Sequence, residues 1–82
     1  MFAAVRFHVD ADASPGLLPR LLQPFARRDL VPDHLQAVRS DDSVTVAISI
    51  GAIPAEMVHL VEGNLRQVIG VRAVTRDLGV AS

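Results

Sequence analysis

The chain has 82 residues, of which 50% are hydrophobic, 4% aromatic and 21% charged, which is room for one small domain. The apolar content is too high for a disordered chain, and no apolar run approaches the roughly 20 residues that span a bilayer. The net charge of −1 offers no basic surface for nucleic acid. With no cysteine, disulfide scaffolds, iron–sulfur sites and thiol chemistry are excluded. We expect a single domain over residues 1–82, cytoplasmic because residues 1–6 lack the build of a signal peptide.

The N-terminal part of the chain first alternates and then becomes helical. Val5, Phe7 and Val9 alternate with polar residues, which predicts a strand with one buried face. After a break at residues 12–16, an apolar stripe with helical spacing predicts a helix; it comprises Leu17, Leu18, Leu21, Leu22 and Phe25. Ser14 or Gly16 is a candidate cap of this helix. Pro24 lies inside the stripe and lacks a backbone N–H, which predicts a kink or an early end.

Two strands and a hairpin follow. A turn over residues 29–33 leads to a short predicted strand over residues 35–39, and the sequence Ser40-Asp41-Asp42-Ser43 is typical of a hairpin loop. The alternation over residues 44–50 predicts the clearest strand of the chain. Gly51 is expected to end it.

The C-terminal part predicts a second helix over residues 54–69, with Glu62 and Arg66 as an i,i+4 ion pair and Gly70 as its stop. A last strand is expected over residues 71–75. The order β-α-β-β-α-β predicts an α+β fold, a ferredoxin-like sandwich with a four-stranded antiparallel sheet and two helices on one face. The expected core comprises Val5, Phe7, Val9, Leu18, Leu21, Leu22, Phe25, Val46, Ile48, Val61, Leu65 and Val68. The other face of the sheet would carry Arg6, His8, Thr45, Ala47 and Ser49.

The residues that could carry chemistry do not form a recognisable set. His8, His34 and His59 lack the spacing of metal ligands, and the pair Asp41-Asp42 is explained by its hairpin. No nucleophile and base stand together in a pattern. We therefore expect no catalytic residue, no metal and no cofactor.

The segment Ser14-Pro15-Gly16-Leu17 joins the first strand to a helix N-terminus, where free N–H groups favour an anion, although glycine after proline is also ordinary turn punctuation. Together with its surroundings, this segment resembles the ACT domain over residues 3–78. Asp12-Ala13-Ser14-Pro15-Gly16-Leu17-Leu18 is similar to the family's (D/N)xxPGxL loop. Residues 25–29 are similar to its common helix end FxxRG, and residues 61–74 resemble the regulatory small subunits of acetolactate synthase.

The resemblance implies a non-catalytic regulatory module of branched-chain amino-acid biosynthesis. It would form a homodimer, as the small core also favours, and would activate a large thiamine-diphosphate synthase subunit. The alternative is a stand-alone homodimer that senses an amino acid. In either case the resemblance places a small amino-acid effector at the loop and the following strand, on Asp12, Ala13, Ser14, Gly16, Leu17 and Val31.

Two of the polar contacts that the resemblance implies for an amino-acid effector are missing. The family's loop glycine matches Gly16, but its acidic or amide loop residue corresponds to Ala13 and its second asparagine to Val31 or a neighbour. Each lost hydrogen bond to a charged group costs about 1.5–3 kcal/mol. We therefore expect no micromolar binding of branched-chain amino acids, unless Asp12 replaces the missing acceptor.

Overall fold

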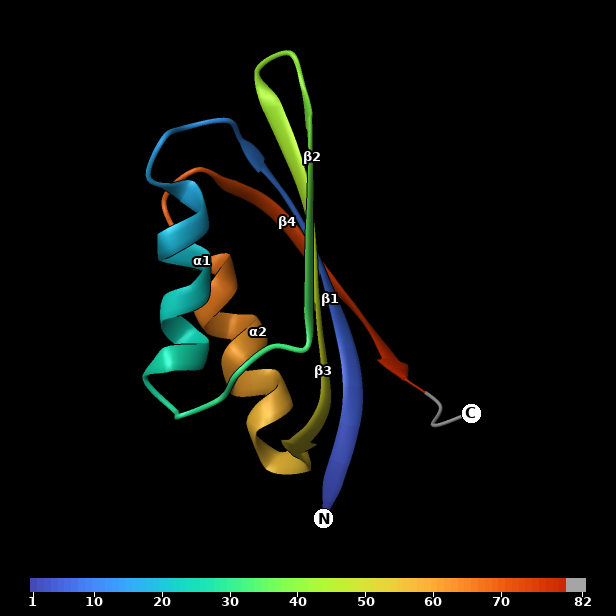
Figure 1. Cartoon of the computed structure of the whole chain (residues 1–82). Coiled ribbons are helices and arrows are strands. Elements are labelled where there is room, and N and C mark those ends of the chain that lie inside the picture. Colours follow the sequence, from blue (N-terminus) through green and yellow to red (C-terminus); the bar gives the residue numbers. More distant parts are fainter. Residues whose placement is uncertain (80–82) are drawn as a thin grey trace.

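In the computed structural model, which describes residues 1–79, four antiparallel strands form one sheet in the order β2-β3-β1-β4. Both helices cover the same face of this sheet (Figure 1), and the predicted ferredoxin-like sandwich is confirmed. The elements are β1 (Phe2–Asp12), α1 (Leu17–Ala26), β2 (His34–Ser40), β3 (Ser43–Pro54), the 3₁₀ turn η1 (Ala55–Met57), α2 (Val58–Arg66) and β4 (Val71–Gly79). Residues 80–82 of the expected domain lie outside the described residues.

The core lies between the helices and the two central strands. Val5, Phe7 and Val9 are buried as the alternation predicts, and Phe7 is paired with Ile48 across β1 and β3. The ring of Phe7 meets that of Phe25 from α1 edge-on, with centroids 5.8 Å apart. The sheet and the helices therefore share one apolar layer.

Two leucines that were expected in the core are not buried. On α1, Leu17, Leu21 and Phe25 face the sheet at 0–2% exposure, whereas Leu18 and Leu22 are 37% and 36% exposed. Residues four apart lie on one line of a helix, while the next residue is rotated by about 100°. The five-residue stripe is therefore wider than the contact with the sheet, and its second line faces outward.

α1 contains two prolines, one near each end. Pro19 occupies the first turn, where its missing N–H costs nothing. Pro24 is buried inside the helix, which continues past it to Ala26; the predicted early end at this proline is therefore not observed. The Leu30 N–H then donates to the Phe25 carbonyl at 2.9 Å and brings the chain back toward the sheet.

The second helix is shorter than predicted. It begins at Val58, since Pro54 still has the extended backbone of β3 and the Ala55 N–H donates to the Met1 carbonyl at 2.9 Å. It ends at Arg66, where i→i−3 hydrogen bonds replace the helical pattern, and Gly70 closes the turn with a φ of 96°. Val68, expected in the core, consequently lies beyond the helix and is only half-buried.

The prediction that Gly51 ends its strand was wrong. β3 continues to Pro54, because the pairing with β1 shifts register between Ala3 and Val5 and absorbs the irregularity as a bulge. The Gly51 N–H donates to the Asp33 carboxylate at 2.5 Å. β4 also extends past the predicted residue 75, to Gly79.

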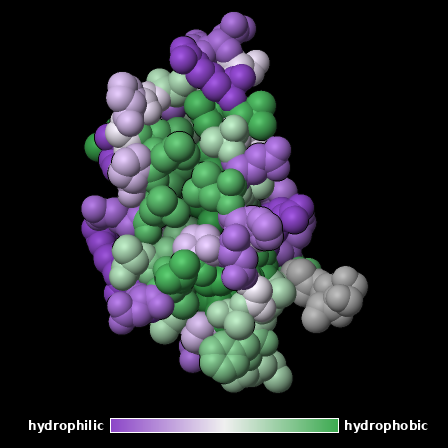
Figure 2. Space-filling model, viewed as in Figure 1, coloured by the Kyte–Doolittle hydropathy of each residue, from purple (hydrophilic) through white to green (hydrophobic). Residues whose placement is uncertain are grey.

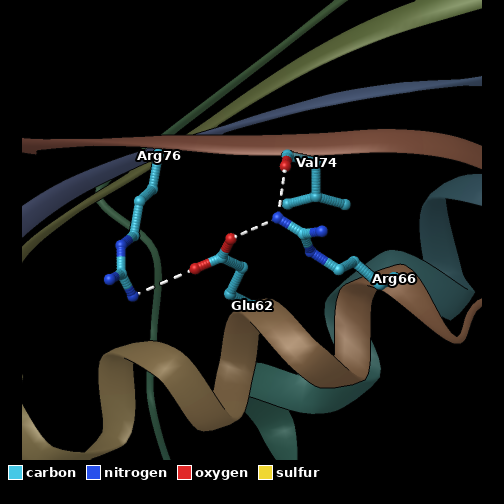
Figure 3. A network of polar contacts seen from close by, with 4 residues as sticks. All are labelled: Glu62, Arg66, Val74 and Arg76. Carbon is cyan, nitrogen blue, oxygen red and sulfur yellow. Dashed lines mark hydrogen bonds and ion pairs between the residues drawn. The ribbon is translucent and has the colours of Figure 1, made fainter.

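Polar contacts fasten α2 to β4 (Figure 3). The Glu62 carboxylate, 17% exposed, accepts from Arg66 at 2.6 Å and pairs with Arg76 of β4 at 3.0 Å. Arg66 also donates to the Val74 carbonyl at 2.9 Å. The predicted i,i+4 pair is confirmed and belongs to a network that joins two elements. Within residues 1–79, neither helix combines the length and the apolar character that a membrane crossing needs.

Candidate ligand-binding site

Backbone hydrogen bonds connect the loop between β1 and α1 to two other segments of the chain. The Asp12 N–H donates to the Gly70 carbonyl and the Ala13 N–H to the Asp42 carbonyl, each at 2.8 Å. The Leu17 N–H then donates to the Ser14 carbonyl at 3.1 Å, at the first turn of α1. These hydrogen bonds hold the loop between the hairpin of β2 and β3 and the start of β4.

This loop borders a hollow of about 560 Å³ between the start of α1 and the end of the β2–β3 hairpin, within the range of small-molecule pockets. Its lining consists of Ala13, Ser14, Pro15, Leu17, Leu18, Pro19, Ala37, Arg39 and Val44. Seven of these nine side chains are apolar, and the polar ones are Ser14 and Arg39. Figure 2 shows apolar surface gathered on this face of the molecule. We refer to these residues as the α1–β2 hollow.

Three of the six residues proposed from the sequence, Ala13, Ser14 and Leu17, line the α1–β2 hollow. Gly16 lies next to it, beneath the side chain of Arg20: a Cβ at Gly16 would stand 2.9 Å from Arg20 Nη1. Arg20 Nη2 donates to Ser14 Oγ at 3.1 Å. Gly16 therefore leaves the space that lets this guanidinium lie across the loop.

Asp12 does not line the hollow. Its carboxylate accepts from Nε of Arg72 at 2.7 Å and also pairs with Nη2 of the same guanidinium. The hydrogen bond and the charge of Asp12 together raise the pKa of Arg72 above its ordinary value, so this cation stays charged at any physiological pH. Asp12 is thereby engaged with the start of β4.

Val31 is also apart from the loop. It is 80% exposed in the connection that follows α1, whereas the loop precedes α1 (Figure 1). The ten residues of α1 separate the two ends by about 15 Å. Within one chain, Val31 and Gly16 do not contribute to the same surface.

Arg39 and Ala37 are lining residues that the sequence reasoning missed. In the register of the hairpin, Leu35, Ala37 and Arg39 are opposite the inward-facing Ile48, Val46 and Val44. An arginine therefore occupies a position on the helix-facing side of β2. The sequence signal for this position was that Arg39 follows the apolar residues Leu35 and Ala37 at alternate positions of the strand.

A second hollow, of about 570 Å³, lies on the outer face of the sheet and includes Arg6, Asp33, His34 and Asp77 in its lining. Three of its charged groups already have partners. Arg6 donates to Ser49 at 3.0 Å, Asp33 accepts from the Gly51 N–H, and Asp77 contacts His8 at 3.0 Å. No group of three or more metal-ligating side chains comes together in the described part of the chain. The α1–β2 hollow is the stronger candidate, because it includes three residues of the predicted loop site and combines a mostly apolar lining with the cation Arg39.

Residues 2–79 match the family model described as "ACT-like domain". No curated protein matches the chain. Among solved structures, the ACT domain from the GTP pyrophosphokinase of Chlorobium tepidum is similar, with a TM-score of 0.80, 16% identity and coverage of 94% of this chain and 100% of that one.

Two further solved structures share the fold. An uncharacterized protein from Thermotoga maritima has a TM-score of 0.75 and 9% identity, and covers 95% of this chain and 98% of its own. The C-terminal domain of the MgtC protein from Mycobacterium tuberculosis has a TM-score of 0.73 and 14% identity, with 95% and 88% covered.

Proposed function

The chain belongs to the family of ACT-like domains, and from this premise we propose that it is a non-catalytic regulatory module that acts as a homodimer on an enzyme. Domains of this family are generally regulatory. The single observation that carries the proposal is the family match over residues 2–79, nearly the full chain. Two charged contacts agree with a structural role for their residues: Glu62 joins α2 to β4, and Asp12 of β1 pairs with Arg72 of β4.

We propose the large catalytic subunit of an acetolactate synthase, or of a relative, as the enzyme partner. The support is the similarity of residues 61–74 to the small subunits of that enzyme. In the fold this stretch forms most of α2, the turn at Gly70 and the start of β4. The α1–β2 hollow favours the second candidate, a homodimer that senses a small effector without a dedicated synthase.

The edge formed by β2 is the surface we propose for the homodimer. All seven residues of β2 are exposed, among them Leu35 at 38% and Val38 at 55%. Leu18 and Leu22 add apolar surface on α1. An edge strand leaves a row of unpaired backbone N–H and C=O groups that a second strand satisfies. Pairing of two β2 strands about a two-fold axis would join two sheets and cover this apolar surface.

The partner proposal is tested by reconstitution with the large synthase subunit of the same organism. We expect the chain to raise the synthase activity and to form a complex of defined mass. A large subunit whose activity and mass are unchanged by excess chain would overturn the synthase proposal.

The dimer proposal is tested by light scattering at tens of micromolar, on the wild type and on Leu35→Lys. A lysine on an exposed edge strand opposes strand pairing, so this variant should be a folded monomer. Ile69→Lys is the matched control, since Ile69 is 80% exposed and lies outside β2, and it should remain dimeric. A monomeric wild type, or a dimeric Leu35→Lys variant, contradicts the proposed interface.

A further inference from the structure

We infer that the α1–β2 hollow binds a small organic carboxylate that has an apolar tail and carries no ammonium group. The inference rests on the proposed regulatory function, because it names the class of effector that the module would sense. It departs from the amino-acid effector that the family resemblance implies. The grounds are the charges and the polar atoms around the hollow.

The charged side chain in the lining of the hollow is an arginine. Arg39 is part of the lining, and a second arginine, Arg20, donates to the lining residue Ser14. The Nε of Arg39 donates to the backbone carbonyl of Asp41 at 3.0 Å. In the described part of the chain, neither arginine forms an ion pair with a carboxylate. An arginine presents several N–H donors in a fixed fork that suits a carboxylate, and here this fork borders an apolar surface.

The apolar part of the lining is suited to an apolar tail of the ligand. Leu17 and Leu18 of α1, Val44 of β3 and the prolines Pro15 and Pro19 are part of the lining. Burial of a branched aliphatic tail against these side chains contributes favourable transfer free energy. The hollow therefore offers an anionic ligand both a cationic end and an apolar end.

The same lining lacks what an ammonium group requires. No acidic side chain is among the nine lining residues, and Ser14 Oγ, the one side-chain oxygen, accepts from Arg20 and keeps only one further lone pair. Asp12, the nearest acid in the loop, is engaged by Arg72. An ammonium placed here lies close to the arginines Arg20 and Arg39 and has no carboxylate among the lining side chains to accept its hydrogen bonds. Loss of a hydrogen bond to a charged group corresponds to about tenfold to hundredfold in affinity.

Three probes of matched shape test the inference on the full chain. Leucine, 4-methylpentanoate and 3-methylbutan-1-amine share one branched tail and differ in having both charged groups, the carboxylate alone or the ammonium alone. Calorimetry, together with the amide NMR shifts of residues 13–18, should show that 4-methylpentanoate binds at least about tenfold more tightly than leucine. The amine should not bind.

Arg39→Gln tests the anchor, because it removes the cation and keeps a shorter, uncharged polar side chain. It should weaken 4-methylpentanoate binding at least about tenfold. Arg27→Gln is the matched control: Arg27 lies just past the opposite end of α1 and donates to Gln23, and its replacement should leave binding unchanged. Circular dichroism and the melting temperature establish that both variants are folded.

Several outcomes overturn the inference. They are leucine binding as tightly as 4-methylpentanoate, binding of the amine, an Arg39→Gln variant with unchanged affinity, and no carboxylate binding at millimolar concentration. A further outcome is carboxylate binding by the monomeric Leu35→Lys variant but not by the wild-type dimer. This would show that the second copy of the chain covers the hollow in the dimer. The two proposals also fail separately. A chain that activates the synthase but binds no carboxylate refutes only this inference, and a chain that binds it but activates no synthase refutes only the partner.

Discussion

Replacing Ile48 by alanine removes three carbons from the centre of the sheet. Ile48 is fully buried, on β3 between its neighbours Phe7 of β1 and Leu35 of β2. The lost transfer free energy is about 2.4 kcal/mol at about 0.8 kcal/mol per buried methylene. The cavity that remains raises the expected loss to about 2–5 kcal/mol. A chain of this length has a total stability of about 4–12 kcal/mol, so this one change removes a large fraction of it.

Thermal unfolding followed by circular dichroism measures this loss. For a domain of this size, 1 kcal/mol corresponds to about 4–8 °C, so we expect the melting temperature to fall by at least about 8 °C. Ile69→Ala is the matched control: the chemical change is identical, but Ile69 is 80% exposed and its loss should stay within about 0.5 kcal/mol. An Ile48→Ala variant that loses as little as the Ile69→Ala control would refute the assignment of this face of β3 to the core.

Four other measurements test particular parts of the structure. Gly63→Ala should stabilise by up to about 1 kcal/mol, since Gly63 is inside α2 and an added Cβ meets nothing within 4 Å; a loss of stability would contradict the open space there. Gly70→Ala should destabilise by about 1–3 kcal/mol, because the φ of 96° suits glycine alone; denaturant unfolding measures both. Glu62→Gln should lower the free energy of unfolding by about 1 kcal/mol, whereas the control Glu56→Gln, at an exposed position, should cause no measurable change. An equal effect of the two substitutions would show that the Glu62 network does not contribute to stability. Calorimetry should detect no micromolar binding of valine, and a micromolar isotherm that Asp12→Ala abolishes would restore the amino-acid site.

The fold was predictable because its elements carry clear periodicities. The alternation over residues 44–50 places Val46 and Ile48 against Val9 and Phe7, as the register of β1 and β3 shows. The ends of elements were less predictable, since they depend on contacts between distant segments. Pro54 remains in β3 instead of starting the helix because Met1 and Ala55 are hydrogen-bonded across the sheet. No local pattern around residue 54 contains that contact.

The candidate site was predictable on its loop side only. Local sequence marks the turn at residues 13–17, because proline, glycine and a helix start coincide there. Arg39 reaches the same hollow from β2, 22 residues or more along the chain. Its inward direction is fixed by the pairing of Arg39 with Val44, which depends on the length of the hairpin. A shift of one residue in that register would direct Arg39 to the outer face and leave the hollow without its cation.

Asp12 shows why adjacency in the sequence is a poor guide to the polar groups of the loop. Ala11 faces the core at 0% exposure, and alternation along β1 turns the next side chain away from the helices. Arg72, on the neighbouring strand β4, donates to the Asp12 carboxylate there. Rotation of Asp12 toward the hollow would therefore break its contact with Arg72 and leave that permanently charged guanidinium without its nearest acid. The ion pair with Arg72 therefore holds the Asp12 carboxylate away from the α1–β2 hollow, where it would be an acceptor for an ammonium group.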